Sequence, residues 1–113
     1  MYNFIGTDIL YIPRIKKIIE NTPSFIKKVY TKKELEIANS LKSPLEFYAT
    51  RFAAKEAIIK ATNGKFNFNE IEVLKAQSGK PLPHIIDNPN IQIELSLSYD
   101  NDYAIAFCII KSK

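Results

Sequence analysis

The chain contains few of the residues that form covalent cross-links or metal clusters. Its 113 residues include one cysteine, Cys108, which excludes an intrachain disulfide framework and a multi-cysteine metal site. Cys108 lies in the apolar stretch "YAIAFCII", a context that predicts a buried, unreactive thiol in a strand. The one histidine, His84, lies in another strand-like segment, and we assign it no role.

Long hydrophobic segments are also missing. No apolar run reaches the roughly 20 residues that a membrane-spanning helix needs. The N-terminal sequence "MYNFIGTDIL" lacks the basic region and the small-residue cleavage site of a secretion signal. Together with the single cysteine, these features lead us to expect a cytoplasmic protein without a membrane partner.

The composition is that of a globular protein with an excess of positive charge. Hydrophobic residues make up 46% of the chain, which predicts a single domain over residues 1–113 with a modest core. The formal net charge is +4, and most of the excess lies in the N-terminal half, for example in "FIKKVYTKKELE". This charge favours an anionic partner, which could be nucleic acid, a phosphate-bearing cofactor or an acidic protein.

The N-terminal segments predict a strand followed by short helices. Residues 2–10 are dominated by aromatic and β-branched residues, which favour a strand. Pro13 suits the first turn of a helix, after which isoleucines form one apolar stripe. We expect Thr22 to be the N-cap of a second helix that begins at Pro23.

Two further capping patterns predict where later helices begin. The sequence "TKKE" from Thr31 has the form of a capping box, in which Glu34 returns the hydrogen bond. The sequence "SPLE" from Ser43 has the same form and opens the longest predicted helix, at about 44–62. Asn63-Gly64 would end that helix, because both residues tolerate positive φ.

The C-terminal half changes to strand-like runs. These runs are "EIEVLKA", "PLPHII", "IQIELSLSY" and "YAIAFCII", with turn signals at 78–81 and 99–102. A strand, then helices including one long helix, then four strands predicts an α+β fold. We expect the helices to pack against a largely antiparallel β-sheet.

The long helix carries charged residues in a segment otherwise suited to burial. Phe52, Glu56 and Lys60 are spaced four apart and share one helical face. One interpretation is an ordinary exposed ion pair between Glu56 and Lys60. The four alanines at positions 53, 54, 57 and 61 also allow a neighbour to approach the helix backbone closely, and a strand could do so without any chemistry.

Asp8, in "FIGTDIL", is the second unusual carboxylate, and Gly6 is expected to leave open space beside it. Asp8 could simply cap the segment after its strand. Alternatively, Asp8 and Glu56 meet and form a hard oxygen site of the kind that suits Mg²⁺. Lys60 would then neutralise phosphate charge or protonate a leaving group. Sequence spacing alone does not bring residues 8 and 56 together.

Four segments resemble the signature blocks of the 4′-phosphopantetheinyl transferases. They are "GTDIL...PRI" at 6–15, "RFAAKEAIIKA" at 51–61, "IEVLKAQSGKP" at 71–81 and "LSLSYDNDYAIAF" at 95–107. The blocks come in the family order and cover nearly the whole chain, and the second is the most specific. The resemblance is closest to the short bacterial type, the holo-acyl-carrier-protein synthases.

The resemblance implies a transferase of fatty acid biosynthesis and lipid metabolism. Such enzymes move the 4′-phosphopantetheine group of coenzyme A (CoA) to a serine of apo acyl carrier protein and release adenosine 3′,5′-bisphosphate. Asp8 and Glu56 would bind Mg²⁺, and Lys60 would contact the phosphates and assist the leaving group. Glu56 or a metal-bound water would take the proton of the serine hydroxyl. These enzymes are typically homotrimers with sites between neighbouring chains.

The same resemblance assigns binding residues. The expected CoA contacts are Lys60, Gly64, Lys80, Pro81, Ser98 and Tyr99. The expected contacts to the acyl carrier protein are Arg14 and Phe25, with steering by Lys16, Lys17, Lys27 and Lys28, since carrier proteins are acidic around the accepting serine.

Two positions depart from the family pattern. The last block usually ends in a histidine that helps to hold the CoA nucleotide, and here Tyr99 takes its place. A tyrosine hydroxyl can donate to phosphate but carries no positive charge. The turn after the long helix is shorter than the usual Gly-Thr-Gly-like form, and Asn63-Gly64 is its nearest equivalent.

Two other functions compete with catalysis. A non-catalytic homologue could bind CoA or a carrier protein, with its nucleotide contact altered at Tyr99. A small RNA-binding domain would also explain the charge, but it predicts aromatic pairs on the sheet beside basic residues. The strand-like runs "IEVLKA" and "IELSLSY" have no such pair, so we expect no nucleic-acid partner.

Overall fold

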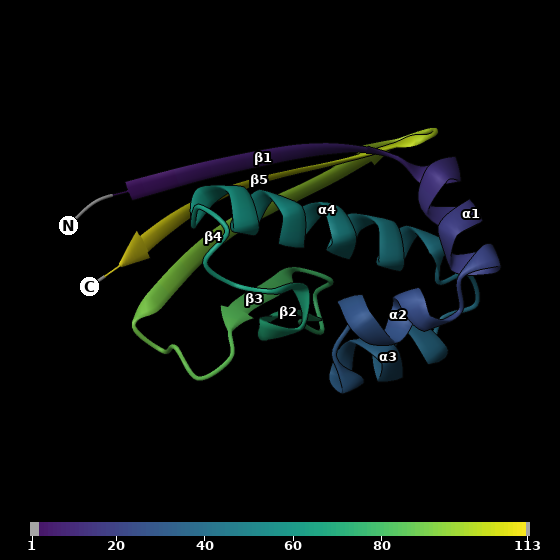
Figure 1. Cartoon of the computed structure of the whole chain (residues 1–113), viewed down its shortest axis with the longest axis horizontal. Coiled ribbons are helices and arrows are strands. Elements are labelled where there is room, and N and C mark those ends of the chain that lie inside the picture. Colours follow the sequence, from purple (N-terminus) through teal and green to yellow (C-terminus); the bar gives the residue numbers. More distant parts are fainter. Residues whose placement is uncertain (1–2, 113) are drawn as a thin grey trace.

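The computed structural model describes residues 3–112, and helices and strands cover most of them (Figure 1). In chain order the elements are β1 (Asn3–Tyr11), α1 (Ile12–Asn21), α2 (Ser24–Val29), α3 (Lys32–Asn39), α4 (Leu45–Ala61), the 3₁₀ helix η1 (Phe68–Glu70), β2 (Ile71–Lys75), β3 (Pro81–Ile85), β4 (Ile91–Asp100) and β5 (Tyr103–Ser112). Residue 2, at the start of the predicted first strand, lies outside the described part.

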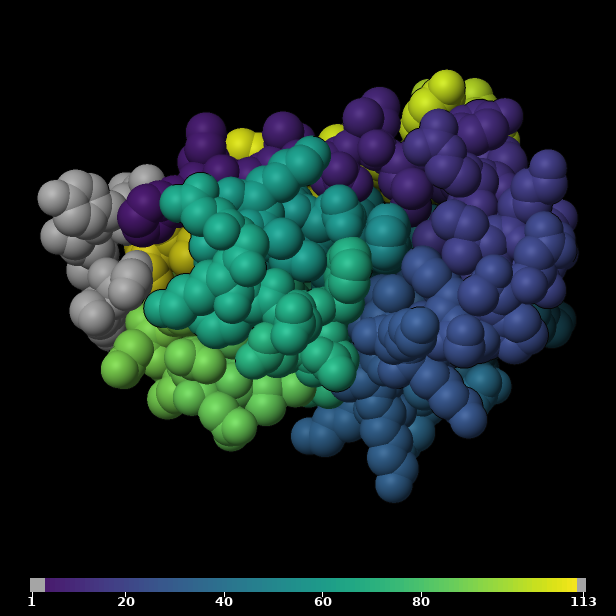
Figure 2. All heavy atoms as spheres, in the orientation of Figure 1, coloured from purple at the N-terminus to yellow at the C-terminus, as the bar shows by residue number. Residues whose placement is uncertain are grey.

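The strands form two antiparallel sheets. The larger sheet has the order β1-β5-β4, and β2 pairs with β3 in a separate hairpin. Helix α4 lies along one face of the larger sheet, while α2 and α3 gather at one end of the molecule beside the hairpin (Figures 1 and 2). The predicted α+β fold is confirmed, although the strands divide into two sheets rather than forming one.

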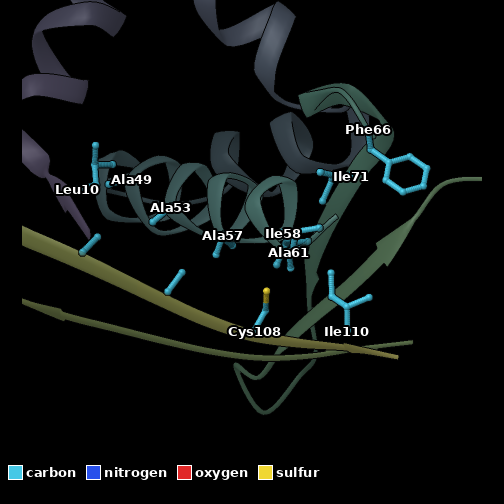
Figure 3. Packing of buried hydrophobic residues seen from close by; sticks show 14 of the residues in the cluster. Leu10, Ala49, Ala53, Ala57, Ile58, Ala61, Phe66, Ile71, Cys108 and Ile110 are labelled. Atoms are coloured by element: carbon cyan, nitrogen blue, oxygen red, sulfur yellow. The ribbon is translucent and has the colours of Figure 1, made fainter. Parts of the chain in front are cut away.

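Small side chains bring α4 close to the sheet. Residues 104, 106 and 108 on the central strand β5 are Ala, Ala and Cys, and all three are buried facing α4. Ala53 and Ala57 of α4 point toward this strand and are also fully buried (Figure 3). The alanines therefore serve the close approach of a sheet, as the sequence suggested. Cys108 is buried as expected, and burial raises the pKa of its thiol to about 11.

Gly6 of β1 lies directly against the backbone of α4, and the expectation of open space beside it was wrong. A Cβ atom at position 6 would lie 1.9 Å from the carbonyl oxygen of Ala57. The backbone of α4 fills that space, so only glycine fits here. Asp8 is the next residue of β1 whose side chain faces α4, because side chains alternate along a strand. The contact at Gly6 therefore also sets the position of Asp8 along the helix.

The helix termini match the sequence patterns in part. The capping box of Thr31 and Glu34 is confirmed at the start of α3. The caps predicted at Thr22 and Ser43 were wrong, because prolines occupy the N-cap positions of α2 and α4 and no side chain caps either helix. Thr22 instead ends α1, where its N–H donates to Ile18. The turn at Asn63-Gly64 has positive φ at both residues, as predicted.

The face of the larger sheet opposite α4 is apolar and exposed. Strand alternation places Ile5 and Ile9 of β1 beside Ile105 and Phe107 of β5, and each of these side chains is at least 42% exposed. Monomeric proteins rarely leave so many large apolar side chains together at the surface. Among the described residues, no helix is long and apolar enough to cross a membrane.

Candidate active site

Asp8 and Lys60 meet across the contact between β1 and α4. The ammonium group of Lys60 donates to the Asp8 carboxylate and to the carbonyl of Thr7, both at 3.1 Å. The Asp8 side chain is 13% exposed and that of Lys60 is 57% exposed, so the pair lies at the rim of the contact. Segments 52 residues apart are therefore joined, and the ion pair that Lys60 forms is with Asp8.

Glu56 is half-buried beside this pair. Burial raises the pKa of its carboxyl group, the negative charge of Asp8 raises it further, and the positive charge of Lys60 opposes both effects. Asp8 is thus close enough for its charge to act on the Glu56 carboxyl. Two carboxylates share one lysine, which leaves an excess of negative charge that a cation would balance.

The carboxylate pair fits a magnesium ion better than a metal held by protein ligands alone. Within residues 3–112, no group of three or more His, Cys, Asp or Glu side chains is placed to hold a metal. Mg²⁺ usually binds through one or two carboxylates and takes its other ligands from phosphate and water. Asp8 and Glu56 supply that minimal set, next to an exposed recess lined by Ile5, Gly6, Thr7, Lys60 and Phe107.

A second recess lies between α4 and β4, and its polar lining includes three cations, Tyr99 and the carboxylate of Glu46. Its positively charged members are Lys42, Arg51 and Lys75. Arg51 is buried and donates to the carbonyls of Val73 and Leu74 in β2. Its guanidinium also lies 4.3 Å from the centre of the Phe47 ring, and burial lowers its pKa. The three cations outnumber the one lining carboxylate, Glu46, so the recess carries a net positive charge that suits an anion.

Some of the residues expected to contact CoA lie at this recess, and others lie elsewhere in the fold. Tyr99 is exposed, and its hydroxyl is hydrogen-bonded to Glu46, which raises its pKa. Lys80 precedes β3 and Pro81 begins it, where Pro81 pairs with Lys75 of the same recess. Ser98 lies on the opposite face of β4 from Tyr99, so the fold does not bring these two side chains together. Gly64 lies in the turn after α4 with φ of +75°.

The two groups of candidate residues occupy different sides of α4. Arg51 and Glu56 are five residues apart, which places them about 140° apart around the helix. Asp8 lies on β1, whereas Tyr99 lies on β4, with β5 between these strands. Helix α4 and the sheet therefore separate the carboxylate cluster from the cationic recess within one chain.

The two expected carrier contacts lie on the short N-terminal helices. Arg14 is exposed on α1. Phe25 is half-buried on α2, and the centre of its ring lies 5.6 Å from that of Phe52, one turn before Glu56. Phe25 is thus linked by packing to the face of α4 that carries the carboxylate.

Sequence reasoning missed the buried partners of the central motif. Lys55, next to Glu56 in the chain, is fully buried and forms a 2.7 Å ion pair with Glu34. The only signal for this pairing was the position of Lys55 among alanines that all proved to be buried. His84, which had no expected role, contacts Glu72 of the neighbouring strand at 3.1 Å.

Comparison with known proteins identifies the family. A family model described as the 4′-phosphopantetheinyl transferase superfamily matches residues 4–108. The holo-[acyl-carrier-protein] synthase of Clostridium novyi (strain NT) is 43% identical over 95% of this chain and 86% of its own length. That of Wolbachia pipientis subsp. Culex pipiens (strain wPip) is 44% identical over 94% of both chains.

Solved structures agree with these relatives. A Chronobacterium ammoniagenes ACPS–CoA complex has a TM-score of 0.87 and 27% identity, covering 100% of this chain and 99% of the other. The synthase from Bacillus anthracis str. Ames in complex with CoA (3′,5′-ADP) has a TM-score of 0.86 and 33% identity, covering 97% and 96%.

The chain therefore belongs to the 4′-phosphopantetheinyl transferase superfamily. Within that superfamily it groups with the holo-[acyl-carrier-protein] synthases, over nearly the full length of both chains. The family and the enzyme class indicated by the sequence motifs are confirmed.

Proposed function

We propose that this chain is an active, cytoplasmic transferase with one domain over residues 1–113. It moves the 4′-phosphopantetheine group from CoA to a serine of apo acyl carrier protein, in fatty acid biosynthesis, and releases adenosine 3′,5′-bisphosphate. The observation that carries this proposal is the contact of Asp8 with Lys60 beside Glu56. A non-catalytic binder has little physical need for two carboxylates and a lysine in one cluster.

Each member of the cluster has a distinct task in the transfer. Asp8 and Glu56 hold Mg²⁺, which when bound spreads the negative charge of the CoA diphosphate. Glu56 is only half-buried at the edge of the cluster and is placed to accept the proton of the serine hydroxyl. Lys60 is largely exposed and can turn from Asp8 toward the departing phosphate, where it stabilises the developing charge.

The cationic recess is suited to the nucleotide end of CoA. Arg51, Lys42 and Lys75 attract a phosphate group, and the Tyr99 hydroxyl can turn from Glu46 to donate to it, at the position where the family usually has histidine. Lys80 and Pro81 extend this surface along the β2–β3 hairpin. Gly64 and Lys60 serve the diphosphate at the other end of α4, while Ser98 remains a weaker candidate because of its outward position.

Because α4 and the sheet separate the two groups, one CoA molecule would not reach both groups of a single chain. We infer that each site lies between neighbouring chains of a homotrimer, with the carboxylate cluster from one chain and the cationic recess from the next. The exposed apolar face of β1 and β5 supplies a surface for such an assembly.

The acceptor is an acidic carrier protein that docks on α1 and α2. Arg14 and four lysines at positions 16, 17, 27 and 28 are exposed there. Phe25 provides an apolar contact at the boundary with α4. Opposite charge steers the two proteins together, and this effect weakens with salt.

The proposal is tested by incubating the protein with Mg²⁺, CoA and an apo acyl carrier protein and following the intact mass of the carrier. We expect a gain of one phosphopantetheine unit that stops when the metal is chelated. CoA binding without any mass gain, across several carriers, would support the non-catalytic alternative instead.

Tyr99→Phe is expected to raise the KM for CoA about fivefold with little change in kcat, because it removes one hydrogen bond of about 1 kcal/mol. Tyr99→His should restore binding, and more so below about pH 6.5, where the imidazole becomes charged. Tyr103→Phe is the matched control, since the Tyr103 ring packs at a tilt against Tyr11, with ring centres 5.4 Å apart, and lines no part of the recess. An unchanged KM for Tyr99→Phe removes this residue from the nucleotide site.

Ile105→Glu is expected to convert the trimer into monomers and to abolish transfer, since a charge on the apolar face opposes its burial, and Ile105 does not line the recess beside the carboxylates. Light scattering measures the mass of the assembly, and the carrier-mass assay measures transfer. Asn90→Glu makes the same charge change in an exposed turn and should alter neither. An active trimer of Ile105→Glu would place the interface elsewhere.

A further inference from the structure

The buried ammonium group of Lys55 joins three separate segments. It donates to the carbonyl of Val29 at 2.6 Å, to the carbonyl of Phe68 at 3.0 Å and to the carboxylate of Glu34 at 2.7 Å. Lys55 thus uses all three of its donors. We refer to Lys55, Glu34, Val29 and Phe68 as the Lys55 cluster.

Glu34 is satisfied as completely as its partner. Its carboxylate also accepts hydrogen bonds from the backbone N–H of Thr31 at 2.8 Å and of Val73 at 2.7 Å. Both Glu34 and Lys55 are fully buried. Well-packed apolar residues often replace a buried ion pair without loss of stability, so a pair like this one is better explained by the arrangement it enforces.

Helix α2 depends on this cluster for its position. It has six residues, far fewer than an isolated helix needs for stability in water. Lys55 holds the carbonyl of its last residue, Val29, and Phe25 packs on Phe52 at its other end. Helix α4 therefore fixes both ends of α2, and with them the outward direction of Lys27 and Lys28.

The two other parts of the site are fixed by different contacts. Asp8 and Lys60 are held by the packing of β1 on α4. The cationic recess is held by Arg51, whose guanidinium bonds to Val73 and Leu74. Removing the ammonium of Lys55 leaves Glu34 able to keep its bonds to Thr31 and Val73.

We propose that Lys55 is a positioning residue for the acceptor protein: it sets the place of α2, and hence of the carrier-docking surface, relative to the Glu56 face of α4. This inference rests on the proposed function, because it names how that site presents the carrier to the reacting groups. Loss of the ammonium group should weaken carrier binding and leave CoA binding nearly unchanged.

The test compares Lys55→Met with the wild-type full-length protein. We expect the Kd for apo carrier protein, measured by titration calorimetry without CoA, to rise at least tenfold. The KM for CoA should stay within about twofold, and amide hydrogen exchange should accelerate in α2 more than in α4. Lys55→Arg, which restores a charged donor, should recover part of the carrier affinity.

Two controls keep the outcome decisive. Lys33→Met removes the same charge from an exposed position on α3 and should change neither constant. If Lys55→Met does not fold, Lys55→Met with Glu34→Gln removes both charges, so that neither is buried alone. An unchanged carrier Kd in a folded variant overturns the inference, as does an equal rise in the KM for CoA.

Failure of the proposed function would be visible separately. If wild-type protein binds carrier but adds no mass to it, the transfer proposal fails. The Kd of Lys55→Met for the carrier still tests the role of Lys55 in that case. If wild-type protein neither binds nor modifies any carrier, both proposals fail.

Discussion

Glu56→Gln is expected to lower the rate of transfer to the carrier protein by about 10³-fold or more, which corresponds to about 4 kcal/mol of transition-state stabilisation. Glutamine keeps the shape of the side chain but is a poor ligand for Mg²⁺ and does not accept the serine proton. Intact-mass time courses at saturating CoA and carrier measure the rate. Glu36→Gln, on the exposed side of α3, is the control and should retain full activity.

Glu56→Gln should also change how the free energy of unfolding depends on pH. The folded-state pKa of Glu56 is raised above its unfolded value, mainly by burial and then by Asp8. The contribution of Glu56 to the free energy of unfolding is therefore most favourable when the pH is below the unfolded-state pKa. It is lost as the pH rises through the folded-state pKa. Without Mg²⁺, Glu56→Gln should be more stable than wild type at neutral pH, and the difference should shrink in acid.

Urea unfolding at several pH values measures this difference, and added Mg²⁺ should reduce it by binding the ionised wild-type pair. A Glu56→Gln protein that keeps more than a tenth of the wild-type rate would contradict the catalytic role. A stability difference that does not depend on pH would contradict the environment that we assign to the carboxyl group.

Gly6→Ala is expected to destabilise the fold by about 3 kcal/mol or more. The new methyl group would lie 1.9 Å from the carbonyl oxygen of Ala57, which is backbone and cannot rotate away. Either β1 or α4 must shift, and a shift moves Asp8 away from Glu56 and Lys60. Chemical denaturation measures the loss, and the fraction that remains folded should also transfer more slowly.

Gly79→Ala is the matched control for this substitution. Gly79 has φ of +93° but has no atom within 4 Å of the position of its missing Cβ, so only backbone strain of about 1 kcal/mol is expected. Replacing Ala57 by glycine should not rescue Gly6→Ala, because the clash is with the backbone of residue 57. A Gly6→Ala protein as stable as wild type would show that β1 and α4 are less tightly packed than described.

Local sequence patterns predicted the elements well and their assembly less well. The long helix, its end at Asn63-Gly64 and the capping box of Thr31 are set by neighbours in the chain, so the sequence shows them directly. The caps expected at Thr22 and Ser43 failed because the following prolines take the N-cap position. The division into two sheets depends on which strands meet, which alternation does not encode.

The candidate site shows the same contrast. Residue types indicated that Asp8, Glu56 and Lys60 carry chemistry, and the family resemblance indicated that they meet. The contact that brings them together depends on the missing side chain of Gly6, whose space the sequence did not show to be filled. The pairing of Lys55 with Glu34 was not predicted, since both residues belong to patterns typical of exposed charges.

The separation of the carboxylate cluster from the cationic recess has a consequence for inheritance. In a ring of identical chains, each complete site would combine halves from two gene products. A cell that expresses one allele defective at Lys60 and another defective at Tyr99 would then assemble some intact sites from two inactive proteins. A single defective allele, conversely, would interfere with the normal one. Its chains would enter the same rings and inactivate sites that they form together with normal chains.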